Sequence, residues 1–277
     1  MNESKQKDQG AQASMIFSNI VDAIQQRIVV FSGKGGVGKT TVAVNLAYAL
    51  AERGQRVGLL DADITGPNVA HMTGVDEPAQ GTAERIVPHQ QRGVKVVSLA
   101  SMLPADAPVI WRGPMRSKVI EQLLNETEWG ELDALVVDLP PGTGDEVLTI
   151  SQRIAPQTAM IVTTPQEVSR IDVRRAVNFA KKLQIPRIGI VENMSGLLCP
   201  HCGEQIDLFG SGQGKSEADA AGVQFFGEIP LDPAVVVGGD QGRPIFLSDP
   251  KSGVADVFRG LADVVKVSEA SDAGASR

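Results

Sequence analysis

A glycine-rich segment carries the residue types best suited to bind phosphate. Residues 33–40 read Gly-Lys-Gly-Gly-Val-Gly-Lys-Thr and match G-x-x-x-x-G-K-[ST], between an apolar run at 28–31 and a helical pattern from Lys39 to about Arg53. Glycines let backbone N–H groups converge on a triphosphate, and a helix N-terminus favours anions. Lys39 can reach the β- and γ-phosphates, and the Thr40 hydroxyl can bind Mg²⁺. A glycine-rich turn that binds nothing needs neither side chain, so we predict a nucleoside triphosphate site. Its contacts are expected from Gly33, Lys34, Gly35, Gly36, Val37, Gly38, Lys39, Thr40 and Thr41.

Two aspartates follow the next strand pattern. Asp61 and Asp63 come after residues 56–60, and side chains two apart on a strand point to the same face. Ligands of an open α/β sheet bind at the carboxyl ends of its strands. One carboxylate is therefore expected to orient a water toward the γ-phosphate, and the other to help hold Mg²⁺ or the loop. Turn formation by aspartate is the competing interpretation.

Further polar residues end later strands. The apolar run at 135–137 precedes Asp138, which predicts a carboxylate near Mg²⁺. A Pro-Pro pair stiffens the chain that follows, and Gly142 has an N–H that we expect to approach a γ-phosphate. Asn193 follows the strand pattern at 188–191, and its amide offers both a donor and an acceptor to an adenine edge.

The chain has two cysteines, and they stand close together. Cys199-Pro200-His201-Cys202 is a tight turn that aims two thiolates at one point. Structural zinc and iron–sulfur clusters each take four ligands, so a two-fold dimer would supply the missing pair near its axis. A thioredoxin-like redox pair is disfavoured because it should follow a first strand and open a helix. The residues predict a metal site shared by two chains, with zinc and an iron–sulfur cluster both open.

These residues need a scaffold that brings strand ends together. Apolar strand patterns alternate with helical patterns, which indicates a parallel sheet covered on both faces. We predict one α/β domain at residues 27–267, with a single doubly wound, mostly parallel sheet and helices on both faces. Residues 1–26 are expected to be a disordered tail with a short helix, and residues 268–277 a frayed tail. Strands are expected at 28–31, 56–60, 94–99, 134–137, 159–162, 188–191 and 223–226, and helices at 39–53, 115–125, 145–154, 168–183 and 254–266.

Composition excludes several classes of function. The 277 residues carry a net charge of −7 and only 4% aromatic residues, so neither a general attraction for nucleic acid nor a base-stacking surface is expected. No apolar run approaches the roughly 18 residues of a membrane span, and the polar N-terminus lacks the apolar region of a secretory signal. We expect a cytoplasmic protein that binds neither nucleic acid nor membrane.

Several motifs, taken in order, resemble one family. Lys34, ahead of the phosphate-binding Lys39, is similar to the first lysine of the deviant Walker A loop in the class that includes MinD, ParA and the nitrogenase iron protein. Together with the cysteine pair, the motifs resemble the Mrp/ApbC branch of that class, the iron–sulfur cluster carriers, over about residues 27–265. The resembling segments are Lys34–Thr40, Asp61–Asn68, Trp111–Met115, Trp129–Asp145, Thr163–Gln166 and Asn193–Gly210.

The resemblance implies a P-loop ATPase that acts as a homodimer. It implies that Lys34 reaches the partner's nucleotide, that Asp63 aligns the attacking water and that Asn193 reads adenine. Hydrolysis would be slow and coupled to cluster binding or transfer. The implied catalytic residues are Lys34, Lys39 and Asp63, and the implied Mg²⁺ ligands are Thr40 and Asp138.

The resemblance also assigns the cysteines. Cys199 and Cys202 of each chain would bind a [4Fe–4S] cluster, taken from a donor and passed to apo-proteins. The alternatives are a MinD/ParA-like positioning ATPase and a zinc-bridged nucleotide switch. The first calls for a basic C-terminus or a basic face, and the Val-Ser-Glu-Ala-Ser-Asp that follows Lys266 is not basic. Many relatives carry an additional small N-terminal domain, for which residues 1–26 are too short.

Overall fold

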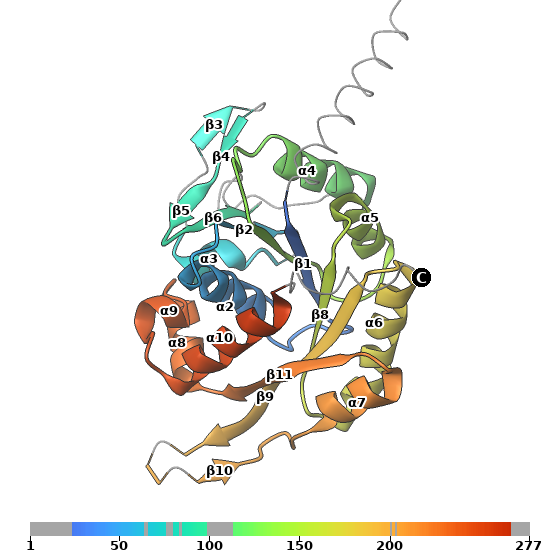
Figure 1. Cartoon of the computed structure of the whole chain (residues 1–277), viewed down its shortest axis with the longest axis vertical. Helices are drawn as coiled ribbons and strands as arrows, with labels where there is room; N and C mark the ends of the chain where they lie inside the picture. The colour runs from blue at the N-terminus through green and yellow to red at the C-terminus, as the bar shows by residue number, and fades with distance from the viewer. Residues whose placement is uncertain are drawn as a thin grey trace, which may run out of the picture.

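The strand that leads into the glycine-rich loop lies in the middle of a mixed sheet (Figure 1). The computed structural model describes residues 24–63, 66–75, 80–82, 85–98, 113–199, 201–202 and 204–266. The sheet has the order β10-β9-β8-β1-β7-β2-β6-β5, and β11 also pairs with β9. Its strands are β1 (Gln26–Phe31), β2 (Val57–Asp61), β5 (His89–Gln91), β6 (Val94–Ser98), β7 (Ala134–Asp138), β8 (Thr158–Thr163), β9 (Arg187–Leu198), β10 (Gln205–Ile206) and β11 (Gln224–Leu231).

The pairing is parallel through the body of the sheet and antiparallel at its edges. β1 pairs in parallel with β7 and β8, and the other inner strands continue the pattern as far as β6 and β11. β5 and β10 join antiparallel at the two ends. A separate small hairpin is formed by β3 (Gln80–Thr82) and β4 (Arg85–Val87). The parallel core aligns the carboxyl ends of β1, β2, β7 and β8, where the predicted site lies.

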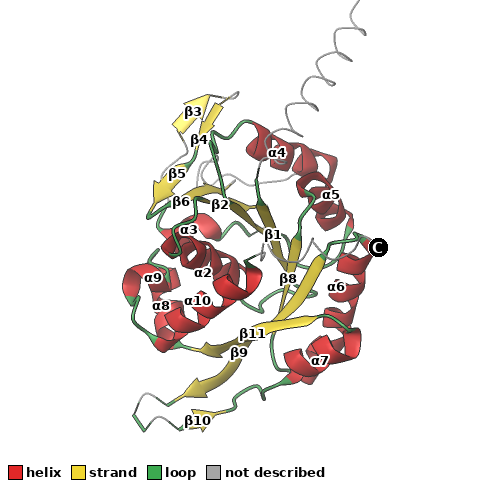
Figure 2. Ribbon diagram, in the orientation of Figure 1, coloured by secondary structure: helices red, strands yellow, loops and turns green. Residues whose placement is uncertain are grey.

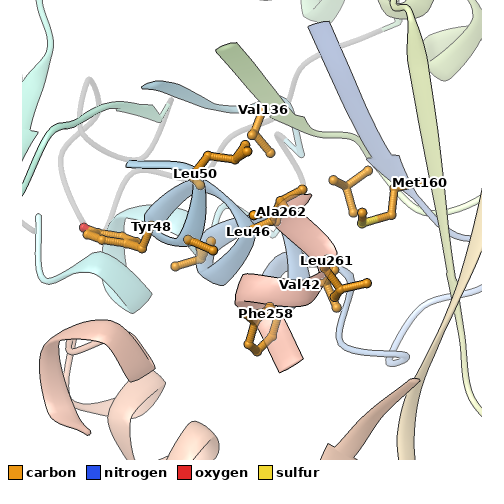
Figure 3. Close-up of a cluster of buried hydrophobic side chains, with 14 of the residues drawn as sticks. Val42, Leu46, Tyr48, Leu50, Val136, Met160, Phe258, Leu261 and Ala262 are labelled. Carbon is orange, nitrogen blue, oxygen red and sulfur yellow. The ribbon is translucent and has the colours of Figure 1, made fainter. Parts of the chain in front are cut away.

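Helices cover both faces of the sheet (Figure 2). On one face, Leu46 and Phe258 belong to the same buried cluster, part of which Figure 3 shows. The other face holds a second cluster that includes Leu123, Ile150 and Val177. The first face is covered by α2 (Lys39–Glu52), α3 (Val69–Thr73), α9 (Ile245–Ser248) and α10 (Gly253–Val265), and the second by α4 (Gly113–Asn125), α5 (Asp145–Ile154), α6 (Arg170–Lys182) and α7 (Gln213–Ala221).

Alternate residues of β1 enter the two clusters. Ile28 and Val30 pack on the α2 face, whereas Val29 and Phe31 pack on the opposite face. A strand buried on both sides has no solvent-facing position, which explains its unbroken apolar sequence. The doubly wound α/β fold predicted from the sequence is confirmed.

One strand is much longer than its apolar pattern. A strand was expected at 188–191, but β9 runs from Arg187 to Leu198 and turns back into β10. Its distal half contains Glu192, Asn193 and Gly196, so it lacks the apolar run that marks a buried strand. In Figure 1 this half of β9 and β10 project from the lower end of the sheet.

Several short elements have no counterpart in the sequence prediction. They include β3, β4, β5, α3, α9 and α8 (Pro233–Asp240). Three to eight residues are too few to show a clear period, so they are visible only in the fold.

The structure describes the chain from residue 24 to residue 266, with gaps, and so excludes most of the two segments expected to be tails. β1 begins at Gln26, one residue inside the segment expected to be a tail. Residues 1–23 and 267–277 lie outside the described residues, and so do most of the segment expected to be a disordered tail with a short helix and the whole of the frayed tail expected at 268–277. Within the described part of the chain, no helix is both long and apolar enough to cross a bilayer.

Candidate nucleotide site and cysteine hairpin

The glycine-rich loop joins β1 to α2 at the centre of the sheet. Gly38 directly precedes α2 with φ of 82°, a left-handed conformation that a residue with Cβ rarely adopts. A Cβ added at Gly38 would lie 2.2 Å from the Asn193 Nδ2 atom. The loop therefore requires glycine here both for its own turn and for the approach of β9.

Lys39 is buried between two carboxylates. Its ammonium Nζ lies 2.7 Å from Asp138 Oδ1 and 3.8 Å from Asp63 Oδ2. The Thr40 hydroxyl donates to the second Asp138 oxygen at 2.7 Å. Burial raises the pKa of Asp138, and the Lys39 ammonium and the Thr40 hydroxyl oppose that rise. The three residues that sequence reasoning assigned to phosphate and Mg²⁺ are thus brought together.

Asp61 organises the turn that carries Asp63. Its carboxylate accepts hydrogen bonds from the Asp63 N–H at 3.1 Å, the Val69 N–H at 3.2 Å and the Ser98 hydroxyl at 3.0 Å. Asp61 is 1% exposed, and burial, with the neighbouring Asp138 charge, raises its pKa to about 8. Of the two roles open to this residue, the geometry fits holding the loop.

A cleft of about 340 Å³ opens in front of these side chains. It has the carboxylate and hydroxyl chemistry for a hard cation, because Thr40 and Asp138 present oxygen atoms of the kind that Mg²⁺ prefers. Its lining comprises Ser32, Gly35, Gly36, Gly38, Lys39, Thr40, Thr41, Asp63, Asn68, His71, Met72, Pro141 and Asp240. The cleft therefore combines N–H donors, one ammonium and oxygen ligands, as a metal-bound polyphosphate requires.

Two predicted nucleotide contacts have protein partners in this structure. The Gly142 N–H donates to the Ser32 carbonyl at 2.8 Å, so a contact with the γ-phosphate requires this bond to break. The Asn193 amide donates to the Val37 carbonyl at 2.9 Å. Their roles toward the γ-phosphate and adenine remain predictions, as does the action of the half-buried Lys34 on a partner's nucleotide.

The two cysteines lie at the far end of the β9–β10 hairpin. The Cys199 N–H donates to the Glu204 carbonyl at 2.9 Å, which closes the turn. Cys199 is half-buried, Cys202 is exposed, and both are free thiols. Hydrogen bonds from the Cys202 and His201 N–H groups and from the Cys202 side chain lower the pKa of Cys199. Across the described ranges, no group of three or more His, Cys, Asp or Glu side chains could hold a metal.

Sequence reasoning missed one residue at the junction of the two sites. Glu192 is completely buried and accepts hydrogen bonds from residues on both sides of the hairpin. A carboxylate directly after an apolar run and before Asn193 was the available signal, but no motif marks it.

The fold and the site together define a P-loop NTPase: a glycine-rich loop between a central parallel strand and a helix, with an aspartate at the end of the neighbouring strand. A family model described as NUBPL iron-transfer P-loop NTPase, of the ParA group, matches residues 23–266. The chain belongs to this family.

Individual relatives agree with this assignment. An iron-sulfur cluster carrier protein of Pyrococcus horikoshii is 50% identical over 249 residues, which cover 86% of this chain and 84% of the relative. A nucleotide-binding protein of Archaeoglobus fulgidus in complex with ADP has a TM-score of 0.76 at 37% identity, covering 88% of this chain and 96% of its own. The cell division ATPase MinD of Pyrococcus furiosus has a TM-score of 0.66 at 26% identity, covering 87% of this chain and 98% of its own.

Proposed function

We propose that this protein is an ATP-dependent carrier of iron–sulfur clusters. Two copies would hold one [4Fe–4S] cluster between them through Cys199 and Cys202 of each chain. The cluster is cargo, received from a donor and passed to apo-proteins. The expected cytoplasmic location also remains a prediction.

The geometry of the cysteine hairpin carries this proposal. One chain offers two thiols on a protruding turn, and no third ligand stands with them among the residues that the structure describes. A four-thiolate site then needs a second copy, and two hairpins related by a two-fold axis can meet at their tips. The hydrogen bonds that lower the pKa of Cys199 favour the thiolate form, which is the form that binds iron.

The nucleotide site supplies the second half of the proposal. On ATP binding, the Lys39 ammonium would exchange the Asp138 carboxylate for the β- and γ-phosphates, and Thr40 and Asp138 would hold Mg²⁺. The metal ion there would neutralise charge on the phosphates. Asp63 lies beside Lys39 and would orient the attacking water, while Lys34 of the partner would approach the same phosphates. Slow hydrolysis would then change how the two chains meet and so the exposure of the cluster.

Anaerobic reconstitution tests the carrier function. Full-length protein supplied with iron and sulfide should hold about four irons per dimer and give the absorption of a [4Fe–4S] cluster. Cys202→Ala should lose nearly all of this iron, and it should keep part of the ATPase activity because the cysteine lies outside the nucleotide cleft.

Metal analysis and gel filtration give the contrary outcomes. Stable full loading of a monomeric Cys202→Ala variant would exclude the bridging site. Zinc retained in place of iron under the same conditions would favour the zinc-bridged switch instead.

A further inference from the structure

The tip of the cysteine hairpin, from Cys199 to Ile206, lies beyond the part of β9 that pairs with β11. Residues 204–212 are all exposed, as is Cys202. β9 stays paired with β11 as far as Leu197, opposite Leu231, and the chain beyond it is held together by the Cys199–Glu204 bond and the two pairs between β9 and β10. The position of the thiols therefore depends on how the base is held.

The Glu192 carboxylate joins the two ends of that base. Its Oε1 accepts the Ser195 hydroxyl at 2.8 Å and the Gly212 N–H at 2.9 Å, and its Oε2 accepts the Gly214 N–H. Ser195 comes just before the residues of β9 that pair with β10, and Gly212 follows β10. Glu192 is 0% exposed and lies at the N-terminus of α7, where a negative charge is favoured.

The next residue along β9 contacts the nucleotide site. The Asn193 amide donates to Val37 in the phosphate loop at 2.9 Å, at the place where Gly38 makes its close approach. Adjacent residues of a strand point to opposite faces. Glu192 and Asn193 therefore attach one short stretch of β9 to the hairpin base on one side and to the phosphate loop on the other. Met194, with φ of 62°, then interrupts the regular strand before the hairpin begins.

We propose that Glu192 is a positioning residue for the cysteine pair, and that its link through Asn193 makes the accessibility of Cys199 and Cys202 depend on the nucleotide bound at the phosphate loop. A nucleotide that rearranges the loop displaces Asn193, and with it the carboxylate that closes the hairpin base. This inference rests on the nucleotide site of the proposed function, but it needs no cluster.

Thiol reactivity in the metal-free, reduced, full-length chain tests the link. The rate of alkylation by iodoacetamide is followed at each cysteine by peptide mass spectrometry, with and without Mg-ADP at a concentration that saturates the variant, as checked by calorimetry. In the wild type, ADP should change the rate at one or both cysteines by about fivefold or more, the lower end of usual coupling.

Glu192→Gln keeps the size of the side chain. It replaces one carboxylate oxygen, which accepts a hydrogen bond, with an NH₂ group that then faces an N–H donor. Its thiols should react about fivefold faster without nucleotide, and the effect of ADP should largely vanish. Glu228→Gln is the matched control, because Glu228 accepts from the same Ser195 hydroxyl at 3.2 Å but is exposed and touches neither glycine N–H. This control should behave as the wild type.

Equal wild-type rates with and without saturating ADP would overturn the coupling, and a wild-type response in Glu192→Gln would overturn the role of the carboxylate. If Glu192→Gln does not fold, Ser195→Ala removes one bond of the base and should shift both readouts in the same direction by a smaller factor.

A chain that binds no ADP would overturn the coupling together with the ATPase proposal. Failed cluster loading with an intact ADP response would leave this inference standing and overturn the carrier function.

Discussion

Single residues at the strand ends owe their chemistry to burial. Asp61, Asp138 and Lys39 are all nearly inaccessible, so each charge needs a partner. Lys39 neutralises Asp138, whereas Asp61 is held by three neutral donors and has its pKa raised to about 8. Burial raises the pKa of both aspartates, but only Asp138 has an ammonium group that opposes the rise.

Replacing Asp61 should reveal its raised pKa as a change in stability. An acid whose folded pKa lies above its unfolded value stabilises the fold fully below the unfolded pKa, near 4, and loses this contribution as pH rises through about 8. Between about pH 5.5 and 7.5 the wild type should thus lose more than about 1 kcal/mol of unfolding free energy relative to Asp61→Asn. Urea denaturation of the wild type and of Asp61→Asn at both pH values measures this loss of unfolding free energy.

Asp133→Asn serves as the control for this titration. The Arg56 guanidinium lowers the pKa of Asp133 to about 2, so the contribution of this exposed pair is lost only in strong acid. Its effect on stability should be the same at both pH values. A pH-independent difference between the wild type and Asp61→Asn would show that Asp61 is ionised throughout.

Among the secondary-structure elements, the phosphate loop packs closely against the start of α6. A Cβ added at Gly33 would lie 2.3 Å from the Asp172 carbonyl oxygen, which is backbone and cannot turn aside. At Gly35 nothing lies within 4 Å of such a Cβ. Both glycines belong to the phosphate loop, but only Gly33 is packed closely against a second element, the helix α6.

Alanine at these two positions should therefore have unequal effects. Gly33→Ala should lower the unfolding free energy by about 1–3 kcal/mol, the usual cost of overpacking, and should weaken ADP binding because the loop must move. Gly35→Ala should change stability by less than about 0.5 kcal/mol. Chemical denaturation and calorimetry compare them, and equal destabilisation would mean that α6 yields to the added methyl group.

At the scale of the whole molecule, the proposed mechanism needs two chains. The cysteine site is half complete in one chain, and Lys34 is expected to act on the nucleotide of the other. Both statements concern an assembly, so they are tested by mixing chains rather than by a single variant.

Mixing Lys34→Ala with Asp63→Ala should restore activity. Each variant alone should hydrolyse ATP at least about tenfold more slowly than the wild type. In a mixed dimer, the site on the Lys34→Ala chain keeps its own Asp63 and receives an intact Lys34 from the partner. With full subunit exchange at equal amounts, half of the dimers are mixed and one of their two sites is complete, which predicts about a quarter of wild-type turnover.

Subunit exchange is checked separately, by energy transfer between labelled chains. Exchange without recovered turnover would place Lys34 in its own site or outside the mechanism. Recovery to about a quarter would support the homodimer even before any cluster is loaded.

Features that depend on neighbouring residues could be predicted from the amino-acid sequence. The phosphate loop, the helix after it and the apolar strands are encoded by local spacing, because glycine conformation, helix start and double burial each act over a few positions. The match between the expected strand at 134–137 and β7 at Ala134–Asp138 shows how far such patterns reach. Even the proposal that two chains share one metal site follows from counting cysteines.

Contacts between groups that are distant in the sequence are visible only in the folded chain. Lys39 and Asp138 are far apart in sequence, and they touch because β1 and β7 pair in parallel and in register. The extension of β9 to Leu198, the Asn193–Val37 bond and the burial of Glu192 at the hairpin base left no periodic trace. Such contacts form only when the packed sheet excludes water from polar groups and leaves each of them to find a partner.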